Sequence, residues 1–264
     1  MNILKTIAAH KRTEVSERKE LYPISLLERK PFFNTEPVSL KEYLLRPGAS
    51  GIIAEFKRQS PSKGTINANA KLEEVSIGYM QAGASALSIL TDKEFFGGKN
   101  EDLIKARELN YCPILRKDFI LDPYQIIESK SIGADAILLI AAILTPEETL
   151  NLATLARSLG LETILEVHGC AELTHLNNQI SILGVNNRNL ADFTVSLDIS
   201  LSLSEFISDG ILTISESGIH DPADVHLLKQ AGYKGFLIGE QFMSAGDPAS
   251  ACQAFISQLK QIEL

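Results

Sequence analysis

From residue 51 onward, short apolar runs alternate with longer stretches in which hydrophobic residues recur at helical spacing. The apolar runs have the length of β-strands, and the stretches between them are long enough for helices. We therefore expect strands near residues 51–57, 84–91, 113–119, 136–142, 163–168, 182–187, 211–217 and 235–239. Eight strands alternating with eight helices predict an α/β fold, a closed (β/α)8 barrel, with a doubly wound open sheet as the alternative.

A glycine just before the apolar run marks the expected end of several helices. The clearest copies of this unit begin at Ala82, Ile132 and Ala231, and Gly160 repeats it. Glycine at a helix end adopts the left-handed conformation without a Cβ clash, and the run that follows suits a strand covered on both faces. A capping residue followed by proline, at Thr145, Asp221 and Asp247, predicts where three of the helices begin.

The first 48 residues have a different pattern. An amphipathic helix is expected over residues 2–20 and a second one over 39–45, and three prolines divide the segment into short pieces. No linker composition separates this segment from the rest. We expect one domain over residues 1–264, in which 1–48 form a helical extension packed on the barrel.

Composition narrows the class of protein. A chain of 264 residues can bury one large core, and its formal net charge of -8 argues against binding to nucleic acid, because phosphates demand a basic surface. Cys112, Cys170 and Cys252 are odd in number and far apart, which favours the reducing cytoplasm over a disulfide framework. Residues 3–9 are too short for a secretory signal, and the longest apolar run, 136–144, is far below the roughly 20 residues that span a bilayer.

Ionisable side chains follow the apolar runs at the carboxyl ends of the predicted strands. Side chains alternate along a strand, so Glu55 and Lys57 share a face, and Glu166 shares one with His168. A structural ion pair explains Glu55 and Lys57 equally well, and a single lysine such as Lys117 is more often a solvated rim charge. Two lysines and two carboxylates converging at one barrel mouth would be costly to bury unused, which favours a catalytic site.

The last two predicted strands carry a phosphate signal. In barrels, the loops after strands seven and eight commonly present backbone N–H groups to a phosphate. Gly218 and Gly239 allow a close approach there, and Ser217 can add a hydroxyl, although such pairs are often only turns. No dinucleotide or P-loop motif is present, and the histidines lack the paired spacing of a metal site. His168 is either a surface residue or a support for Glu166.

Six motifs together point to a known family. They begin at Ile53 (Ile-Ala-Glu-Phe-Lys-Arg-Gln-Ser-Pro-Ser-Lys-Gly), Ser88, Leu115 (Leu-Arg-Lys-Asp-Phe-Ile), Ile164, Gly184 and Ser215. Over nearly its full length the chain resembles the indole-3-glycerol-phosphate synthases of tryptophan biosynthesis. The resemblance implies a TIM barrel that closes an indole ring without a cofactor. Its substrate would be 1-(2-carboxyphenylamino)-1-deoxyribulose 5-phosphate, and its products indole-3-glycerol phosphate, CO2 and water.

The resemblance also assigns the catalytic roles. Lys117 would be the general acid at the ribulose carbonyl, and Lys57 would bind the anthranilate carboxylate and assist the later loss of hydroxide. Glu166 would act as general acid/base, while Glu55 and Asn186 orient these groups. Proton donation by a lysine is easiest when burial or a like charge lowers its pKa, and we expect the two lysines to have this effect on each other.

The remaining positions concern binding. Ser217 would complete the catalytic set. Of the substrate-binding residues, Ser60, Gly218, Gly239 and the backbone of Glu240 would hold the phosphate, Phe96, Phe119 and Leu138 would wall the ring, and Arg188 and Glu216 would lie near the ligand. Two residues depart from the family pattern: Gln59 stands where a lysine is common, and Glu240 stands where a serine would add a hydroxyl. The backbone N–H of Glu240 can still bind phosphate if its carboxylate turns away.

Rival interpretations are a sister phosphate barrel, such as phosphoribosylanthranilate isomerase or the tryptophan synthase α subunit, and a non-catalytic binder of phosphorylated metabolites. Two lysines opposite two glutamates, together with the helical extension, count against both. We expect a small phosphorylated and carboxylated substrate, no nucleic-acid or membrane partner, and a cytoplasmic monomer.

Overall fold

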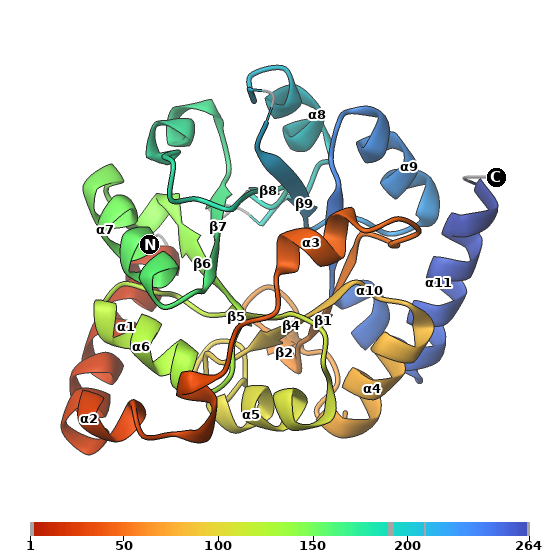
Figure 1. The fold of residues 1–264 in the computed structure, drawn as a ribbon. Helices are drawn as coiled ribbons and strands as arrows, with labels where there is room; N and C mark the ends of the chain where they lie inside the picture. The colour runs from red at the N-terminus through yellow and green to blue at the C-terminus, as the bar shows by residue number, and fades with distance from the viewer. Residues whose placement is uncertain (1–2, 190–192, 209, 263–264) are drawn as a thin grey trace.

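The computed structural model describes residues 3–189, 193–208 and 210–262. Its centre is a closed barrel of eight parallel strands, in the order β1-β10-β9-β8-β7-β6-β5-β4 (Figure 1). The strands are β1 Ile52–Phe56, β4 Ala86–Leu90, β5 Ile114–Lys117, β6 Ala136–Ile140, β7 Glu162–Val167, β8 Ile182–Asn186, β9 Leu212–Glu216 and β10 Gly235–Ile238. Each lies within two residues of its predicted run, so the barrel is confirmed and the open sheet is excluded.

Helices surround the barrel, in the connections between its strands and after the last strand. They are α4 Leu72–Ala82, α5 Asn100–Leu109, α6 Pro123–Ser131, α7 Pro146–Ser158, α8 Asp198–Ser204, α9 Pro222–Gln230 and α11 Pro248–Ile262, with the short α10 Glu240–Met243 before the last. The connection from β7 to β8 contains a 3-10 helix, η3 Cys170–His175, in place of a long α-helix. Another 3-10 turn, η2 Ala141–Ile143, follows β6 directly.

Hydrogen bonds at the helix ends explain these boundaries. The Thr145 hydroxyl accepts from the amide of Glu148, whose carboxylate accepts from the amide of Thr145, so α7 begins with a capping box. Asp221 opens α9 in the same way, and Asp247 accepts from the amides two and three residues later at the start of α11. At the other end of α4, Gly83 has φ 98° and accommodates the left-handed turn. The predicted starts and glycine ends are confirmed.

The N-terminal segment contains α1 Ile3–Leu21, α2 Ile24–Leu27, the 3-10 helix η1 Pro31–Asn34 and α3 Leu40–Leu45. Both helices predicted here are confirmed, while residue 2 lies outside the described residues. Helix α3 crosses the front of the barrel in Figure 1, at the amino ends of the strands. There Leu44 packs against the first residue of β10, and the Ser39 hydroxyl donates to Glu162 of β7 at 2.7 Å. At the opposite end, Leu4 and Ile7 of α1 join the apolar cluster inside the barrel.

Two apolar layers hold the fold together. The inner layer fills the barrel with inward-facing strand residues such as Ile53, Leu115 and Ile214. The outer layer lies between the strands and the helices and includes Leu87 and Leu139. Burying each such side chain stabilises the fold by about 1.5–3 kcal/mol. The inner filling becomes polar at the carboxyl ends of the strands, where the site lies. None of the described helices has the length and apolar composition needed to cross a bilayer.

Candidate active site

A cavity of about 360 Å³ opens at the carboxyl ends of the barrel strands. Its lining includes every site residue predicted from the sequence: Glu55, Lys57, Ser60, Phe96, Lys117, Phe119, Leu138, Glu166, Asn186, Arg188, Glu216, Ser217, Gly218, Gly239 and Glu240. The amino groups of β1 and β5 and the carboxylate of β7 therefore share one pocket, as the proposed chemistry requires. The roles of these residues stay predictions.

The end of β1 forms the first ion pair of the site. Lys57 Nζ lies 2.9 Å from Glu55 Oε1, and the Ser88 hydroxyl of β4 donates to Glu55 Oε2 at 3.3 Å. Glu55 is 3% exposed. A Cβ added at Gly239 would come within 2.7 Å of Glu55 Oε1, so the backbone after β10 approaches this carboxylate as closely as only glycine allows. The pair thus joins β1 and β4 to the expected phosphate side.

Lys117, at the end of β5, lies between two carboxylates. Its Nζ donates to Glu166 Oε2 at 2.9 Å and lies 3.2 Å from Glu216 Oε2. Burial acts to lower the pKa of Lys117, but the carboxylates of Glu166, Glu216 and Glu55 together raise that pKa above its ordinary value. The expectation that the neighbouring lysine would lower it is therefore wrong. Attraction to close carboxylates outweighs the effect of burial.

Glu166 is held through both of its oxygens. While Oε2 accepts from Lys117, Oε1 lies 3.3 Å from His168 Nε2, and His168 Nδ1 in turn lies 3.3 Å from Glu172. Burial acts to raise the pKa of Glu166, but Lys117 and His168 hold that pKa below its usual range. Burial acts to lower the pKa of His168, and the two carboxylates raise it to about 10. His168 is thus a charged neighbour of Glu166, which agrees with the supporting role.

Glu216, the last residue of β9, is 1% exposed. Within the described part of the chain, neither of its carboxylate oxygens accepts a hydrogen bond, although Lys117 forms an ion pair with Oε2. Burial raises the pKa of Glu216 to about 7 against the opposing charge of Lys117, and the carboxylates of Glu166 and Glu55 add to the rise. A buried carboxyl with this pKa can hold or release a proton near neutrality.

Asparagines organise the loops after β8 and β9. Asn186 Oδ1 accepts from the amide of Arg188 at 3.0 Å. The buried Asn187, which the sequence analysis missed, donates to the Ser217 carbonyl at 3.0 Å and to the Ser215 hydroxyl at 2.9 Å. Ser217 has φ 67°, a backbone conformation that serine rarely adopts, and these contacts hold it there. The motif beginning at Gly184 contains Asn187, but the sequence does not show its contacts, because its partners come from β9 and the residues after it.

Cations and hydroxyls gather on the expected phosphate side. A short hairpin, β2 Gln59–Ser60 and β3 Gly64–Thr65, follows β1. Lys63, between these strands, has its Nζ 3.3 Å from Glu240 Oε1, and Arg188 Nη2 lies 3.5 Å from Glu240 Oε2. The Glu240 carboxylate therefore bridges two cations across the mouth. We expected the amide of Glu240 to bind phosphate only if this carboxylate turns away. The side chain instead points to the two cations.

Apolar side chains form the other wall. The rings of Phe96 and Phe119 lie 5.8 Å apart between centroids, at an angle of 38°. Lining residues that the sequence analysis missed include Ile3, Leu4 and Ile7 of α1, and Phe193 and Val195 after β8. The amphipathic pattern predicted the apolar face of α1 but could not show that this face meets the cavity. The segment with Phe193 and Val195 has no periodic pattern at all.

Fold and site together define a (β/α)8-barrel enzyme whose ionisable groups meet at the carboxyl ends of its strands. A family model described as indole-3-glycerol phosphate synthase matches residues 4–255. The chain belongs to this family of decarboxylating lyases, which act in tryptophan biosynthesis.

Individual relatives agree. The chain is 46% identical over 260 residues to the indole-3-glycerol phosphate synthase of Bacteroides thetaiotaomicron, covering 98% of this chain and 99% of that protein. It is 39% identical over 251 residues to the enzyme of the same name from Bordetella pertussis, covering 94% and 96%. Among solved structures, tryptophan synthase subunit alpha from Legionella pneumophila is similar, with a TM-score of 0.60, 15% identity and coverage of 84% and 97%. That likeness concerns the fold alone.

Proposed function

We propose that this cavity converts 1-(2-carboxyphenylamino)-1-deoxyribulose 5-phosphate into indole-3-glycerol phosphate, CO2 and water. The observation that carries the proposal is the meeting of Lys57, Lys117 and Glu166 in one pocket that also has an aromatic wall. An anthranilate ring suits the flat apolar surface of Phe96 and Phe119, and the substrate's two anionic groups suit the local cations of an acidic chain. A protein that only bound phosphorylated metabolites would have no use for these paired charges.

Ring closure is the first step. The ring carbon that carries the carboxylate attacks the ribulose carbonyl carbon, and the carbonyl oxygen takes a proton from Lys117 Nζ. The raised pKa of Lys117 keeps the amine protonated at neutral pH, which is the form that a general acid needs. Once the proton has moved, the charge of Lys117 no longer lowers the pKa of Glu166, although His168 still does. Glu166 therefore becomes a stronger base for the steps that follow.

Two departures complete the reaction. The carboxylate leaves as CO2, and its bonding electrons restore the aromatic ring system. A proton then leaves the methylene carbon beside the nitrogen for Glu166, while the hydroxyl at the former carbonyl carbon leaves as water with a proton from Lys57. Lys57 has first paired with the carboxylate, which its place at the end of β1 permits, and Glu55 holds it at 2.9 Å. Asn186 and Ser217 complete the set around the reacting carbons.

Substrate binding would use the two sides of the cavity separately. The phosphate would lie against the Ser60 hydroxyl and the amides of Gly218, Gly239 and Glu240, with Arg188 nearby. The ring would lie between Phe96, Phe119 and Leu138. Glu216 would hold Lys117 together with Glu166. This division fixes the ribulose chain between a charged end and an apolar end, with its carbonyl near Lys117.

The wider setting follows from the same substrate. We also propose a monomeric enzyme that acts in the cytoplasm as one domain over residues 1–264, needs no cofactor and binds no nucleic acid. The formal charge of -8 supports the last point, and the three cysteines are free, as the reducing cytoplasm requires.

A direct assay tests the proposal, because the chain contains no tryptophan. The wild-type protein should generate indole fluorescence and CO2 from the substrate. Lys117→Ala should lower kcat by about 10²–10⁴-fold, the usual contribution of a general acid, while substrate still binds. Lys93→Ala, which removes an exposed lysine after β4, is the matched control and should leave kcat unchanged. Binding without turnover by the wild type would reject the function, and full turnover by Lys117→Ala would reject the assigned acid.

A further inference from the structure

A lysine of the N-terminal helix lies buried at the edge of the site. Lys11 of α1 has a side chain that is only 1% exposed, although lysine is among the residues least often buried. Its Nζ lies 2.9 Å from Asp92 Oδ2, 3.0 Å from Asp118 Oδ1 and 2.8 Å from Glu14 Oε2. Asp92 follows β4 and Asp118 follows β5. One ammonium group therefore ties α1 to the ends of two neighbouring barrel strands.

Each of the two aspartates in turn holds the backbone of an aromatic residue. Asp92 Oδ1 accepts from the amides of Phe95 at 2.8 Å and Phe96 at 3.2 Å. Asp118 Oδ1 accepts from the amide of Phe119 at 2.8 Å. Phe96 and Phe119 are the two rings that line the cavity together. Both carboxylates thus bind Lys11 and the backbone of the aromatic wall, Asp92 through its two different oxygens and Asp118 through Oδ1 alone.

We propose that Lys11 is a positioning residue, which sets the spacing of Phe96 and Phe119 for the substrate ring through Asp92 and Asp118. The inference rests on the proposed function, because it needs the anthranilate ring to lie on this wall. Lys11 does not line the cavity and makes no contact with the reacting groups. Its effect on catalysis is expected in the binding of the ring rather than in the proton transfers.

The two aspartates depend on Lys11 to different degrees. Asp118 Oδ2 also accepts from Thr91 at 2.6 Å and from Arg116 at 3.1 Å. Asp92 Oδ2, by contrast, accepts no hydrogen bond from the described residues, so its only close cation is Lys11. Loss of Lys11 would leave the buried carboxylate of Asp92 with two backbone amides but without its cation, and buried charges avoid this state by moving or by binding a proton. The loop that carries Phe96 should shift first.

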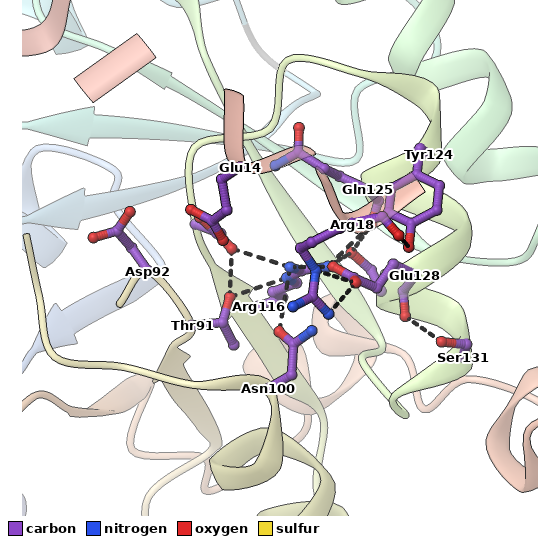
Figure 2. A network of polar contacts seen from close by, with 12 residues as sticks. Glu14, Arg18, Thr91, Asp92, Asn100, Arg116, Tyr124, Gln125, Glu128 and Ser131 are labelled. Atoms are coloured by element: carbon purple, nitrogen blue, oxygen red, sulfur yellow. Dashed lines mark hydrogen bonds and ion pairs between the residues drawn. The ribbon is translucent and has the colours of Figure 1, made fainter. Parts of the chain in front are cut away.

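A second ion pair between α1 and the barrel provides a control. Arg18 of α1 donates to Glu128 Oε1 of α6, and Arg116 donates to Glu128 Oε2 at 2.8 Å. Figure 2 shows Arg18 and Arg116 grouped with Glu128, and Asp92 apart from them. Arg18→Met therefore loosens α1 while Arg116 still compensates Glu128, and it leaves Asp92 and Asp118 with their partners.

The experiment compares Lys11→Met and Arg18→Met with two probes of different chemistry. Anthranilate carries the ring, and inorganic phosphate tests the opposite side of the cavity; both are measured as inhibitors beside KM and kcat. Lys11→Met should raise KM and the inhibition constant of anthranilate by about tenfold, since small misplacements of binding groups have effects of this size or larger. The inhibition constant of phosphate should stay as in the wild type, and Arg18→Met should change neither.

Three outcomes would overturn the inference. These are wild-type constants for Lys11→Met, an equal loss of anthranilate and phosphate affinity, or the same loss of anthranilate affinity in Arg18→Met. If Lys11→Met does not fold, the double variant Lys11→Met/Asp92→Asn removes both the ion pair and the negative charge of Asp92. It should fold and still bind anthranilate weakly, whereas wild-type affinity would reject the inference. Absence of turnover by the wild type would instead reject the proposed function, which separates the two failures.

Discussion

The charge on a single nitrogen, Lys117 Nζ, depends on three carboxylates that reach it from different strands. The sequence places Glu55, Glu166 and Glu216 at strand ends, but it contains no distances. Contacts of 2.9 Å to Glu166 and 3.2 Å to Glu216 decide that attraction exceeds the effect of burial. The lysine is consequently a permanent cation at neutral pH, and the group nearest to titration is Glu216 instead.

Glu216→Gln tests that conclusion through stability. The pKa of Glu216 rises from an ordinary 4.5 to about 7, so the folded protein binds this proton more tightly than the unfolded chain does. The ionised, buried carboxylate therefore destabilises the fold above pH 7, and the penalty disappears as the pH falls toward 4.5. The variant should raise the free energy of unfolding by about 1–3 kcal/mol at pH 8 and change it little at pH 5, as measured with urea.

Glu147→Gln, an exposed position in the first turn of α7, is the control and should show no such pH dependence. An equal effect of Glu216→Gln at pH 5 and pH 8 would contradict the raised pKa.

At the level of elements, strands and helices with a regular sequence pattern could be predicted, and elements without one could not. The eight barrel strands and the capped helices could be predicted, because each repeats a hydrophobic period or a capping signal over several residues. The β2–β3 hairpin and α10 could not, since strands of two residues and a helix of four are too short to show any period. The site residues could be predicted from their positions at strand ends. Their contacts could not, because these join side chains from different strands.

The bridge between these short elements supports a prediction of its own. The Glu240 carboxylate of α10 forms ion pairs with Lys63 of the hairpin and with Arg188 after β8. A phosphate would otherwise attract these two cations. Partly exposed ion pairs of this kind are worth about 0–1 kcal/mol. Glu240→Gln should therefore tighten the inhibition constant of inorganic phosphate by up to about fivefold.

Lys63→Gln is the matched change of opposite sign and should weaken phosphate binding. If both variants weaken it, the carboxylate organises the two cations for phosphate instead of competing with it.

At the scale of the whole molecule, the N-terminal segment touches both ends of the barrel. Helix α3 covers the amino ends of the strands (Figure 1), and residues of α1 line the cavity at the carboxyl ends. The sequence predicted two helices packed on a barrel, yet it could not place them, because placement depends on contacts such as Lys11 with Asp92 that join distant segments. Buried ion pairs of this type tie the segment to the barrel.

Acid should loosen these ties together. Burial acts to raise the pKa of Asp118 and of Glu128, but their cationic partners hold both pKa values below the ordinary range. Each carboxylate thus stabilises the fold above the unfolded value near 4, and the contribution is lost as the pH falls below it. The free energy of unfolding should decrease steadily from about pH 5 to pH 3. Glu128→Gln should be less stable at pH 7 and show a shallower slope; a slope unchanged by this variant would contradict the prediction.

The position of α1 also decides at which end of the protein a tag can be attached. Ile3 lines the cavity, so a tag joined just before α1 would lie beside the proposed substrate site. Helix α11 ends at the outer edge of the view in Figure 1, and Ile262 in its last turn is 45% exposed. Immobilisation on a support, or fusion to another enzyme, should therefore be made through the carboxyl terminus.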